Sequence, residues 1–321
     1  MLLAPSFVVP APIDLFVAAE DEPARRPRDD HRLHRVRHRV YAPVERWQAL
    51  KPWERYLARV HAVALLRPEA VFCLESAAAL LGLPLFGEPR DVHVFDLGSS
   101  TSHRVGDVVR HTSLVAPPVI TVGGIHLTSP AATAAALGRA LPPAFALAVI
   151  DAAIAPRQCA LTTLEEIGDT RSSAVASRGI RVLDWAIDAA DPSAESPGES
   201  VSRAVIAWLG FEPPQLQHTF HYEGAVDRVD FWWPKVRVAG ESDGYGKYRL
   251  NDPLAARSTL TEEKRREDRL RRHVSGFARW DWADAMRVAP LESALMQAGV
   301  PRVSRPQRLM LATLRSHRRS R

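Results

Sequence analysis

Cysteine and long hydrophobic runs are scarce in this sequence. Its two cysteines, Cys73 and Cys159, can neither build a disulfide framework nor supply four ligands to a structural zinc site. The longest apolar stretches, residues 5–19 and 144–155, are each interrupted by aspartate, and neither reaches the roughly 20 residues that span a bilayer. The first residues also lack the positive charge and cleavage site of a secretory signal, so we expect a cytoplasmic protein without a membrane segment.

Aromatic residues and a moderate charge content indicate a folded chain. The 321 residues include 8 Trp, 10 Phe and 5 Tyr, and 25% of them are charged. This composition excludes a disordered chain, a collagen-like repeat and a coiled coil. At roughly 150 residues per domain, the length predicts about two globular domains.

Positive charge is concentrated in the C-terminal part of the chain. Residues 1–195 contain 20 Lys and Arg against 22 Asp and Glu, whereas residues 196–321 contain 22 against 15. A basic domain beside a nearly neutral one fits a polyanion partner, most often nucleic acid. Surface arginine that serves only solubility is the alternative explanation, and DNA is the partner that we expect.

Small, polar and Pro- or Gly-containing segments predict the domain boundaries. The sequence AADPSAESPGES, which starts at residue 189, has the composition of a linker. Another irregular stretch, EDEPARRPRDD, precedes residue 31. The predicted parts are an irregular segment 1–30, a mixed region 31–188, a linker 189–198, a domain 199–285 and a basic extension 286–321.

The region before the linker mixes helical and strand patterns. Residues 31–41 fit a strand or hairpin and also a helical spacing, so their type stays open. Apolar spacing predicts helices at 52–66 and 74–83, and Ser129 followed by Pro130 predicts the start of a helix that runs to residue 140. Short Val- and Ile-rich segments predict strands at 91–95, 105–111 and 119–127.

The domain after the linker has a simple predicted order of elements. A helix at 199–209 precedes strands at 215–222, 226–233 and 236–241, and a highly charged helix at 259–274 precedes a last strand at 277–282. A helix between the third and fourth strands implies a mixed sheet. The predicted fold class is therefore α/β (α+β), with an α-β-β-β-α-β second domain.

Two acidic residues occur where neighbouring strands are predicted to pair. A tight Trp-Pro-Lys turn would bring Asp230 and Glu241 side by side, with Asp243 and Lys247 directly following. Paired carboxylates suit a hard divalent ion, here Mg²⁺ or Mn²⁺, which can activate water for attack on a phosphodiester. A carboxylate between Val229 and Phe231 is costly to place in a central strand without such a partner.

These residues and the order of elements resemble the PD-(D/E)XK nuclease superfamily, most closely its very-short-patch-repair (Vsr-like) branch. The resemblance implies that Asp230 and Glu241 bind the metal and that Glu199 is an acidic residue of the first helix. The strict motif has lysine where this chain has Asp243, so the role of the lysine either passes to Lys247 or is lost. The pattern also resembles that of an uncharacterised actinobacterial family, many of whose members carry an AbiEi-type antitoxin-like domain in front; the residues that carry this resemblance are Ser196, Glu199, Arg203, Pro214, Gln217, Asp230, Glu241, Asp243 and Gly244.

Each candidate residue also has a structural explanation. Glu199 lies three residues after Ser196, which is the spacing of a helix capping box. Asp243 precedes Gly244, a common turn dipeptide, and Lys247 suits an ordinary surface position. The charged helix can be a solvated face with internal ion pairs. In the functional interpretation, the residues that contact nucleic acid are Arg203, Gln217, Lys264, Arg265 and Arg269.

The first half of the chain resembles a second family. The stretch that begins RVYAPVERWQALKPWERYLARVHAV and continues to LLGLPL is similar to the core of AbiEi-type antitoxins, and RLHRVRHRVYAP resembles the wing of a winged helix-turn-helix. The preceding recognition helices are missing or degenerate here, which argues against reading of the major groove by a helix.

Three hypotheses follow. The first is an AbiEi-like protein with a Vsr-like endonuclease domain that binds DNA and cleaves it with Mg²⁺. The second is a non-catalytic antitoxin or transcriptional regulator that keeps the nuclease fold as a scaffold, and the third is a protein that neutralises a toxin without contacting nucleic acid. The sequence does not indicate an oligomeric state.

Overall fold

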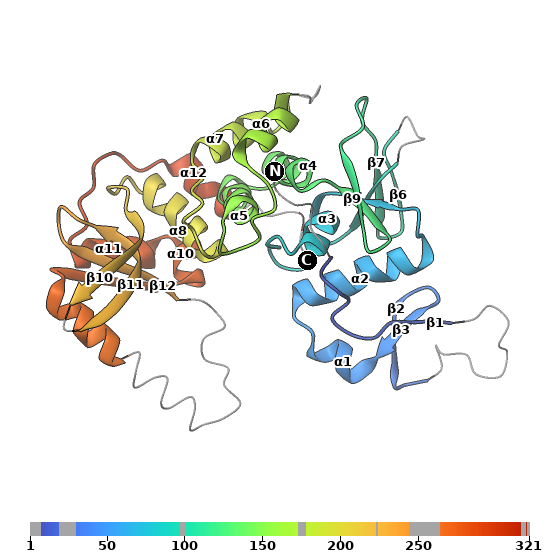
Figure 1. Ribbon diagram of the computed structural model, residues 1–321, viewed down its shortest axis with the longest axis horizontal. Coiled ribbons are helices and arrows are strands. Elements are labelled where there is room, and N and C mark those ends of the chain that lie inside the picture. The colour runs from blue at the N-terminus through green and yellow to red at the C-terminus, as the bar shows by residue number, and fades with distance from the viewer. Residues whose placement is uncertain are drawn as a thin grey trace.

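The computed structural model describes residues 8–18, 30–96, 101–172, 178–222, 224–243, 264–315 and 319. The described residues form three β-sheets connected and covered by helices (Figure 1). The mixture of helices with parallel and antiparallel strands confirms the predicted α/β (α+β) class. None of the described helices is long and apolar enough to cross a bilayer.

The first sheet contains the basic segment whose type the sequence left open. Its three antiparallel strands have the order β1 (Phe16–Val17), β3 (Val40–Pro43), β2 (Leu33–Arg37). The segment is therefore a hairpin, and Arg39 in its turn has a φ of 66°. Helices α1 (Val44–Ala49) and α2 (Pro52–Leu66) follow, and α2 has the predicted bounds.

The second sheet has six strands in the order β6-β7-β5-β4-β9-β8. Two segments that were each predicted as one strand are two strands, because glycines with positive φ at 106, 123 and 124 form turns inside them. Helix α3 (Leu74–Leu81) follows β4 and ends at Gly82, as its sequence predicts. The strands are β4 (Val71–Phe72), β5 (Val92–Phe95), β6 (His103–Val105), β7 (Val108–His111), β8 (Val119–Val122) and β9 (Ile125–Thr128).

Four helices connect this sheet to the C-terminal domain. Helix α4 (Pro130–Ala140) starts as predicted, since the Ser129 hydroxyl accepts a hydrogen bond from the Ala132 amide at 3.3 Å. Helix α5 (Pro143–Ile154) is apolar on all sides and almost wholly buried. The remaining two are α6 (Leu164–Ser172) and α7 (Ile180–Asp188).

The C-terminal domain follows the predicted order of elements. Helix α8 (Pro197–Trp208) precedes β10 (Gln215–Tyr222), β11 (Ala225–Trp233) and β12 (Val238–Asp243), and a helix at 264–273 precedes β13 (Gly276–Asp281). The sheet order is β10-β11-β12-β13, in which only β12 and β13 pair in parallel. Helices α10 (Trp282–Arg287), α11 (Ala289–Ala298) and α12 (Arg308–Ala312) complete the domain, with a short 3₁₀ turn η2 (Thr313–Arg315).

The two predicted domains pack directly on each other. Helix α5 lies against α8 near the centre of the molecule (Figure 1). A buried ion pair crosses this contact, because Arg203 of α8 donates to the fully buried Asp151 of α5 at 2.7 Å. Residues 189–198 lie beside the pair, and the Asp191 amide donates to Asp151 at 2.9 Å. The domain boundaries themselves stay predictions.

Candidate functional site

The predicted pair of acidic residues lies on neighbouring strands of the C-terminal sheet. Phe231 of β11 pairs with Gly240 of β12, so Asp230 and Glu241 occupy the next opposed positions. Asp230 accepts a hydrogen bond from the Ser242 amide at 2.9 Å, which fixes its carboxylate against β12. The sequence prediction that a tight turn brings these two carboxylates together is therefore confirmed.

Glu199 of α8 joins these two carboxylates. Its side chain is 5% exposed and accepts hydrogen bonds from the Glu195 amide at 2.9 Å, the Ser196 hydroxyl at 2.8 Å and the Gln217 amide side chain at 2.7 Å. Burial, together with the negative charge of Asp230, raises the pKa of Glu199 to about 7. Glu199 therefore takes part in the predicted cap of α8 and also faces the acidic pair.

Glu241 is the third member of this acidic cluster, which we define as Glu199, Asp230 and Glu241. Burial raises its pKa, and the charge of Asp230 adds to the effect, while the Arg266 guanidinium opposes it. Arg266 donates to Glu241 at 2.5 Å and to the carbonyl of Arg228. This arginine belongs to the basic run of the predicted charged helix, but sequence reasoning did not assign it to the site.

Gln217 has a strained backbone at the edge of the acidic cluster. Its φ of 54° is unusual for a non-glycine residue inside a strand. Its side-chain nitrogen holds Glu199, whereas its Oε1 atom is buried without a hydrogen-bond partner in the structure. The sequence indicated Gln217 only by resemblance, because a residue type does not reveal its φ.

Two further candidates, Asp243 and Lys247, lie at the end of β12 and after it. Asp243 is the last residue of β12 and accepts a hydrogen bond from the Nε atom of Arg279 at 2.6 Å. It therefore takes part in an ion pair at the position where the strict nuclease motif has lysine. Arg279 also reaches Glu267 at 2.9 Å. Lys247 lies outside the described residues, and its role stays a prediction.

The basic residues predicted to contact nucleic acid have different surroundings. Lys264 and Arg265 are exposed on the first turn of the 264–273 helix. Arg269 makes two hydrogen bonds of 2.8 Å to Asp227, and Arg203 is engaged with Asp151 at the contact between the domains. The structure therefore presents Lys264 and Arg265 to solvent and places Arg203 and Arg269 in ion pairs. Contact with nucleic acid stays a prediction for all four.

The donor chemistry of the cluster fits a hard divalent cation. Among the described residues, no group of three or more His, Cys, Asp and Glu side chains is arranged to hold a metal ion. Mg²⁺, however, commonly takes one or two carboxylates and completes its shell with water and substrate oxygen. Asp230 and Glu241 are such a pair, and the Oε1 atom of Gln217, whose nitrogen donates to Glu199, is a buried oxygen without a hydrogen-bond partner in the structure.

Comparison with known proteins links the first domain to antitoxins. Residues 70–185, which extend from the six-stranded sheet to α7, match the AbiEi antitoxin C-terminal domain. The match agrees with the predicted resemblance of the N-terminal half. The matched residues end before the acidic cluster, so the predicted resemblance of the C-terminal domain to nucleases rests on its order of elements and its residues.

Two curated relatives come from Mycobacterium tuberculosis. "Uncharacterized protein MT2308" of strain CDC 1551 / Oshkosh and "Uncharacterized protein Rv2248" of strain ATCC 25618 / H37Rv are each 36% identical over 174 residues. The aligned part is 54% of this chain and 62% of each relative. The chain thus spans less than two thirds of these relatives. No solved structure matches the chain significantly.

Proposed function

We propose that the C-terminal domain is a metal-dependent endonuclease centre that acts on DNA, attached to an antitoxin-type N-terminal region. The observation that carries this proposal is the acidic cluster, in which a helix and two strands bring three carboxylates together. Crowded carboxylates with raised pKa values are typical of sites where a cation or a proton is needed. The mixed sheet around them has the order of elements expected for the nuclease superfamily.

Asp230 and Glu241 are the residues that would hold Mg²⁺ or Mn²⁺. Such an ion supplies, when bound, activation of water and stabilisation of charge on the phosphate. Glu241 must then give up its ion pair with Arg266 in order to bind the metal ion. The released guanidinium of Arg266 can turn toward the phosphate backbone of the DNA. Lys247 follows β12 closely and is the residue that we assign to orienting the water.

Glu199 and Gln217 position the site. With a pKa of about 7, Glu199 can accept or release a proton near neutral pH. The Gln217 side chain, held by its strained backbone, donates to one carboxylate oxygen of Glu199 and so fixes its orientation. These two residues therefore control the charge next to Asp230.

Cleavage of labelled plasmid and short duplexes by the purified protein tests the proposal. We expect cutting in Mg²⁺ or Mn²⁺ and none in EDTA. Asp230→Asn and Glu241→Gln should each lower the rate by at least about 100-fold, the upper end of the loss seen when a group that merely supports a metal ligand is removed. Glu292→Gln, which removes a charge from an ion pair on α11, is the matched control and should keep full activity. Cutting that survives EDTA or both cluster substitutions would contradict the proposal.

The second candidate is a non-catalytic antitoxin or regulator. Two observations favour it: the antitoxin match covers residues 70–185, and Arg266 already neutralises Glu241. Salt-sensitive DNA binding without cleavage, unchanged by Asp230→Asn, would support this candidate. Co-purification of a toxin with the protein, in the absence of DNA binding, would instead favour a protein that only neutralises its partner.

A further inference from the structure

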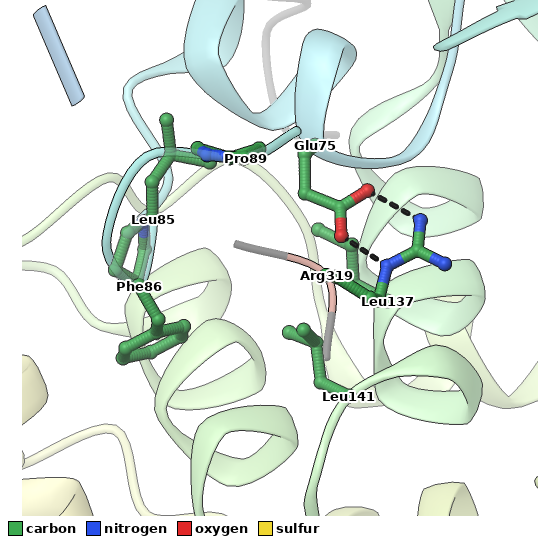
Figure 2. A pocket seen from close by; sticks show the side chains of 8 residues that line it. Glu75, Leu85, Phe86, Pro89, Leu137, Leu141 and Arg319 are labelled. Atoms are coloured by element: carbon green, nitrogen blue, oxygen red, sulfur yellow. Dashed lines mark hydrogen bonds and ion pairs between the residues drawn. The ribbon is translucent and has the colours of Figure 1, made fainter. Parts of the chain in front are cut away.

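A buried carboxylate far from the acidic cluster receives the C-terminal end of the chain. Glu75, in the first turn of α3, is 4% exposed. Arg319 reaches both of its oxygens, with its Nη2 2.7 Å from Oε2 and its Nε bonded to Oε1 (Figure 2). The two residues are 244 positions apart in the sequence. A two-pronged pair of this kind recognises the planar guanidinium, which a lysine cannot reproduce.

The surroundings of Glu75 form a pocket for an arginine side chain and its backbone. The amide of Arg90 donates to the carbonyl oxygen of Arg319 at 2.9 Å, so the protein holds the main chain as well as the side chain. Beside the pair, Glu75 and Arg319 line a small cavity together with apolar side chains from the loop after α3, from α4 and from its C-cap (Figure 2). These apolar residues are Pro84, Leu85, Phe86, Pro89, Leu137 and Leu141.

Two histidines and a serine form a hydrogen-bonded group next to Glu75. The His93 Nε2 atom lies 3.4 Å from Glu75 and 3.3 Å from Arg319, and its Nδ1 atom is 2.8 Å from the Nε2 of His111. The His93 amide donates to the Ser76 hydroxyl at 2.7 Å. These contacts come from α3, β5 and β7, all of which belong to the antitoxin-like region. The domain therefore places His93 beside the carboxylate, on which Arg319 makes its two hydrogen bonds.

Three features distinguish this pair from an ordinary surface ion pair. The carboxylate is buried, so leaving it without a partner is costly. The guanidinium side chain is 29% exposed, so water competes for it and lowers the net gain from the internal contact. The site also binds through backbone and side chain together, as peptide-recognition sites do. An arginine from another chain can make the same hydrogen bonds to Glu75 and to the Arg90 amide.

We propose that the Glu75 pocket is a recognition site for an arginine on an extended peptide, and that Arg319 is its internal occupant. A partner protein that presents such an arginine displaces the C-terminal segment. The pocket thus serves as an interaction surface of the antitoxin-like region, and its occupancy reports whether the partner is bound. This proposal is independent of the nuclease proposed for the C-terminal domain.

Peptide binding to the full-length protein tests the proposal. The probe is a fluorescein-labelled peptide of residues 315–321, RSHRRSR, and its binding is followed by fluorescence anisotropy. The Arg319→Ala protein, whose pocket lacks its own arginine, should bind the peptide at least about tenfold more tightly than wild type, which corresponds to about 1.4 kcal/mol. Equal affinities of the two proteins would overturn the internal occupancy.

Substitutions in the peptide separate recognition from general charge attraction. In the Arg319→Ala protein, a peptide with Arg319→Lys should bind about tenfold more weakly, whereas a peptide with Arg318→Lys, of equal charge, should bind as the original does. Equal binding of all three peptides would overturn the proposal. The Arg319→Ala protein with Glu75→Gln should lose the preference for arginine, and because the peptide series uses the native Glu75, the test does not depend on how well that double variant folds.

Discussion

Glu75 and Glu199 occupy similar positions in the two domains but differ in charge state. Each lies in the first turn of a helix and each is buried, with 4% of Glu75 and 5% of Glu199 exposed. Burial opposes the charge of both, yet Arg319 reverses this effect and lowers the pKa of Glu75, whereas Asp230 adds to it and raises the pKa of Glu199 to about 7. The neighbouring charge, and not the burial or the helix end, decides the difference.

This contrast separates two uses of a buried carboxylate. An arginine that satisfies the carboxylate makes a site for recognition, and the site is complete while the arginine is present. A second carboxylate leaves an excess of negative charge that a cation or a proton must relieve. The N-terminal domain therefore pairs its buried carboxylate with an arginine, as the proposed recognition site requires, and the C-terminal domain places its carboxylate beside another, as the proposed metal site requires.

The sharpest test of the contrast is the pH dependence of stability. Because the pKa of Glu199 is raised, the folded protein binds more protons than the unfolded chain between the ordinary value of 4.5 and about 7. The free energy of unfolding should therefore fall as pH rises through this window. We expect the difference between wild type and Glu199→Gln to change by about 3 kcal/mol between pH 4.5 and 7.5, measured by urea unfolding.

Two variants make this measurement specific. Asp230→Asn removes the charge that contributes to the raised pKa of Glu199, so it should flatten the same slope in part. Glu292→Gln, on the exposed face of α11, should leave the slope of wild type unchanged. An identical pH dependence of wild type and Glu199→Gln would show that Glu199 titrates normally and that the acidic cluster is not crowded.

The Glu75 site should show the opposite pH dependence. Arg319→Ala leaves a buried carboxylate without its arginine and with His93 at 3.4 Å, and we expect a loss of about 2 kcal/mol at pH 7, less than for a wholly buried pair because Arg319 is partly exposed. Since the pKa of Glu75 is lowered, this contribution is present above the ordinary value of 4.5 and is lost as pH falls below it. Urea unfolding at pH 7 and in acid measures both effects.

A surface ion pair provides the control for this loss. Arg287 contacts Asp284 at 2.6 Å, but its side chain is 66% exposed, so Arg287→Ala should change the free energy of unfolding by no more than about 0.5 kcal/mol. Adding Glu75→Gln to Arg319→Ala should restore part of the lost stability, because the unpaired charge is removed. Equal effects of Arg287→Ala and Arg319→Ala would mean that the Glu75 pair is only a surface contact.

Local patterns predicted much of the C-terminal domain. Alternating apolar residues placed β10 at its observed bounds, and the short turn after β11 was sufficient to predict that Asp230 lies beside Glu241. The cap of α8 followed from the spacing of Ser196 and Glu199. These features depend on residues close together in sequence, where periodicity and turn chemistry decide the structure.

The rest depends on distant contacts or on backbone angles. Arg266 and Glu241, which form an ion pair, are 25 positions apart in the sequence, and Arg319 and Glu75 are 244 positions apart. The positive φ of Gln217 is imposed by the sheet and does not follow from a glutamine in a strand pattern. No spacing rule links such pairs, so the sequence indicated the basic runs but not their partners.

The smallest expected effect concerns the ring behind the Glu75 pair. Burial is the largest cause that lowers the pKa of His93 to about 4; Glu75 opposes the shift and Arg319 adds to it. Arg319→Ala removes a lowering charge and leaves the carboxylate 3.4 Å from the ring, so we expect the pKa to rise by about 1, measured from the ring resonances by NMR. The pKa of His218 in the C-terminal sheet should not change. A His93 pKa that stays at about 4 would mean that burial sets it and that Arg319 contributes nothing measurable to the electrostatics of the ring.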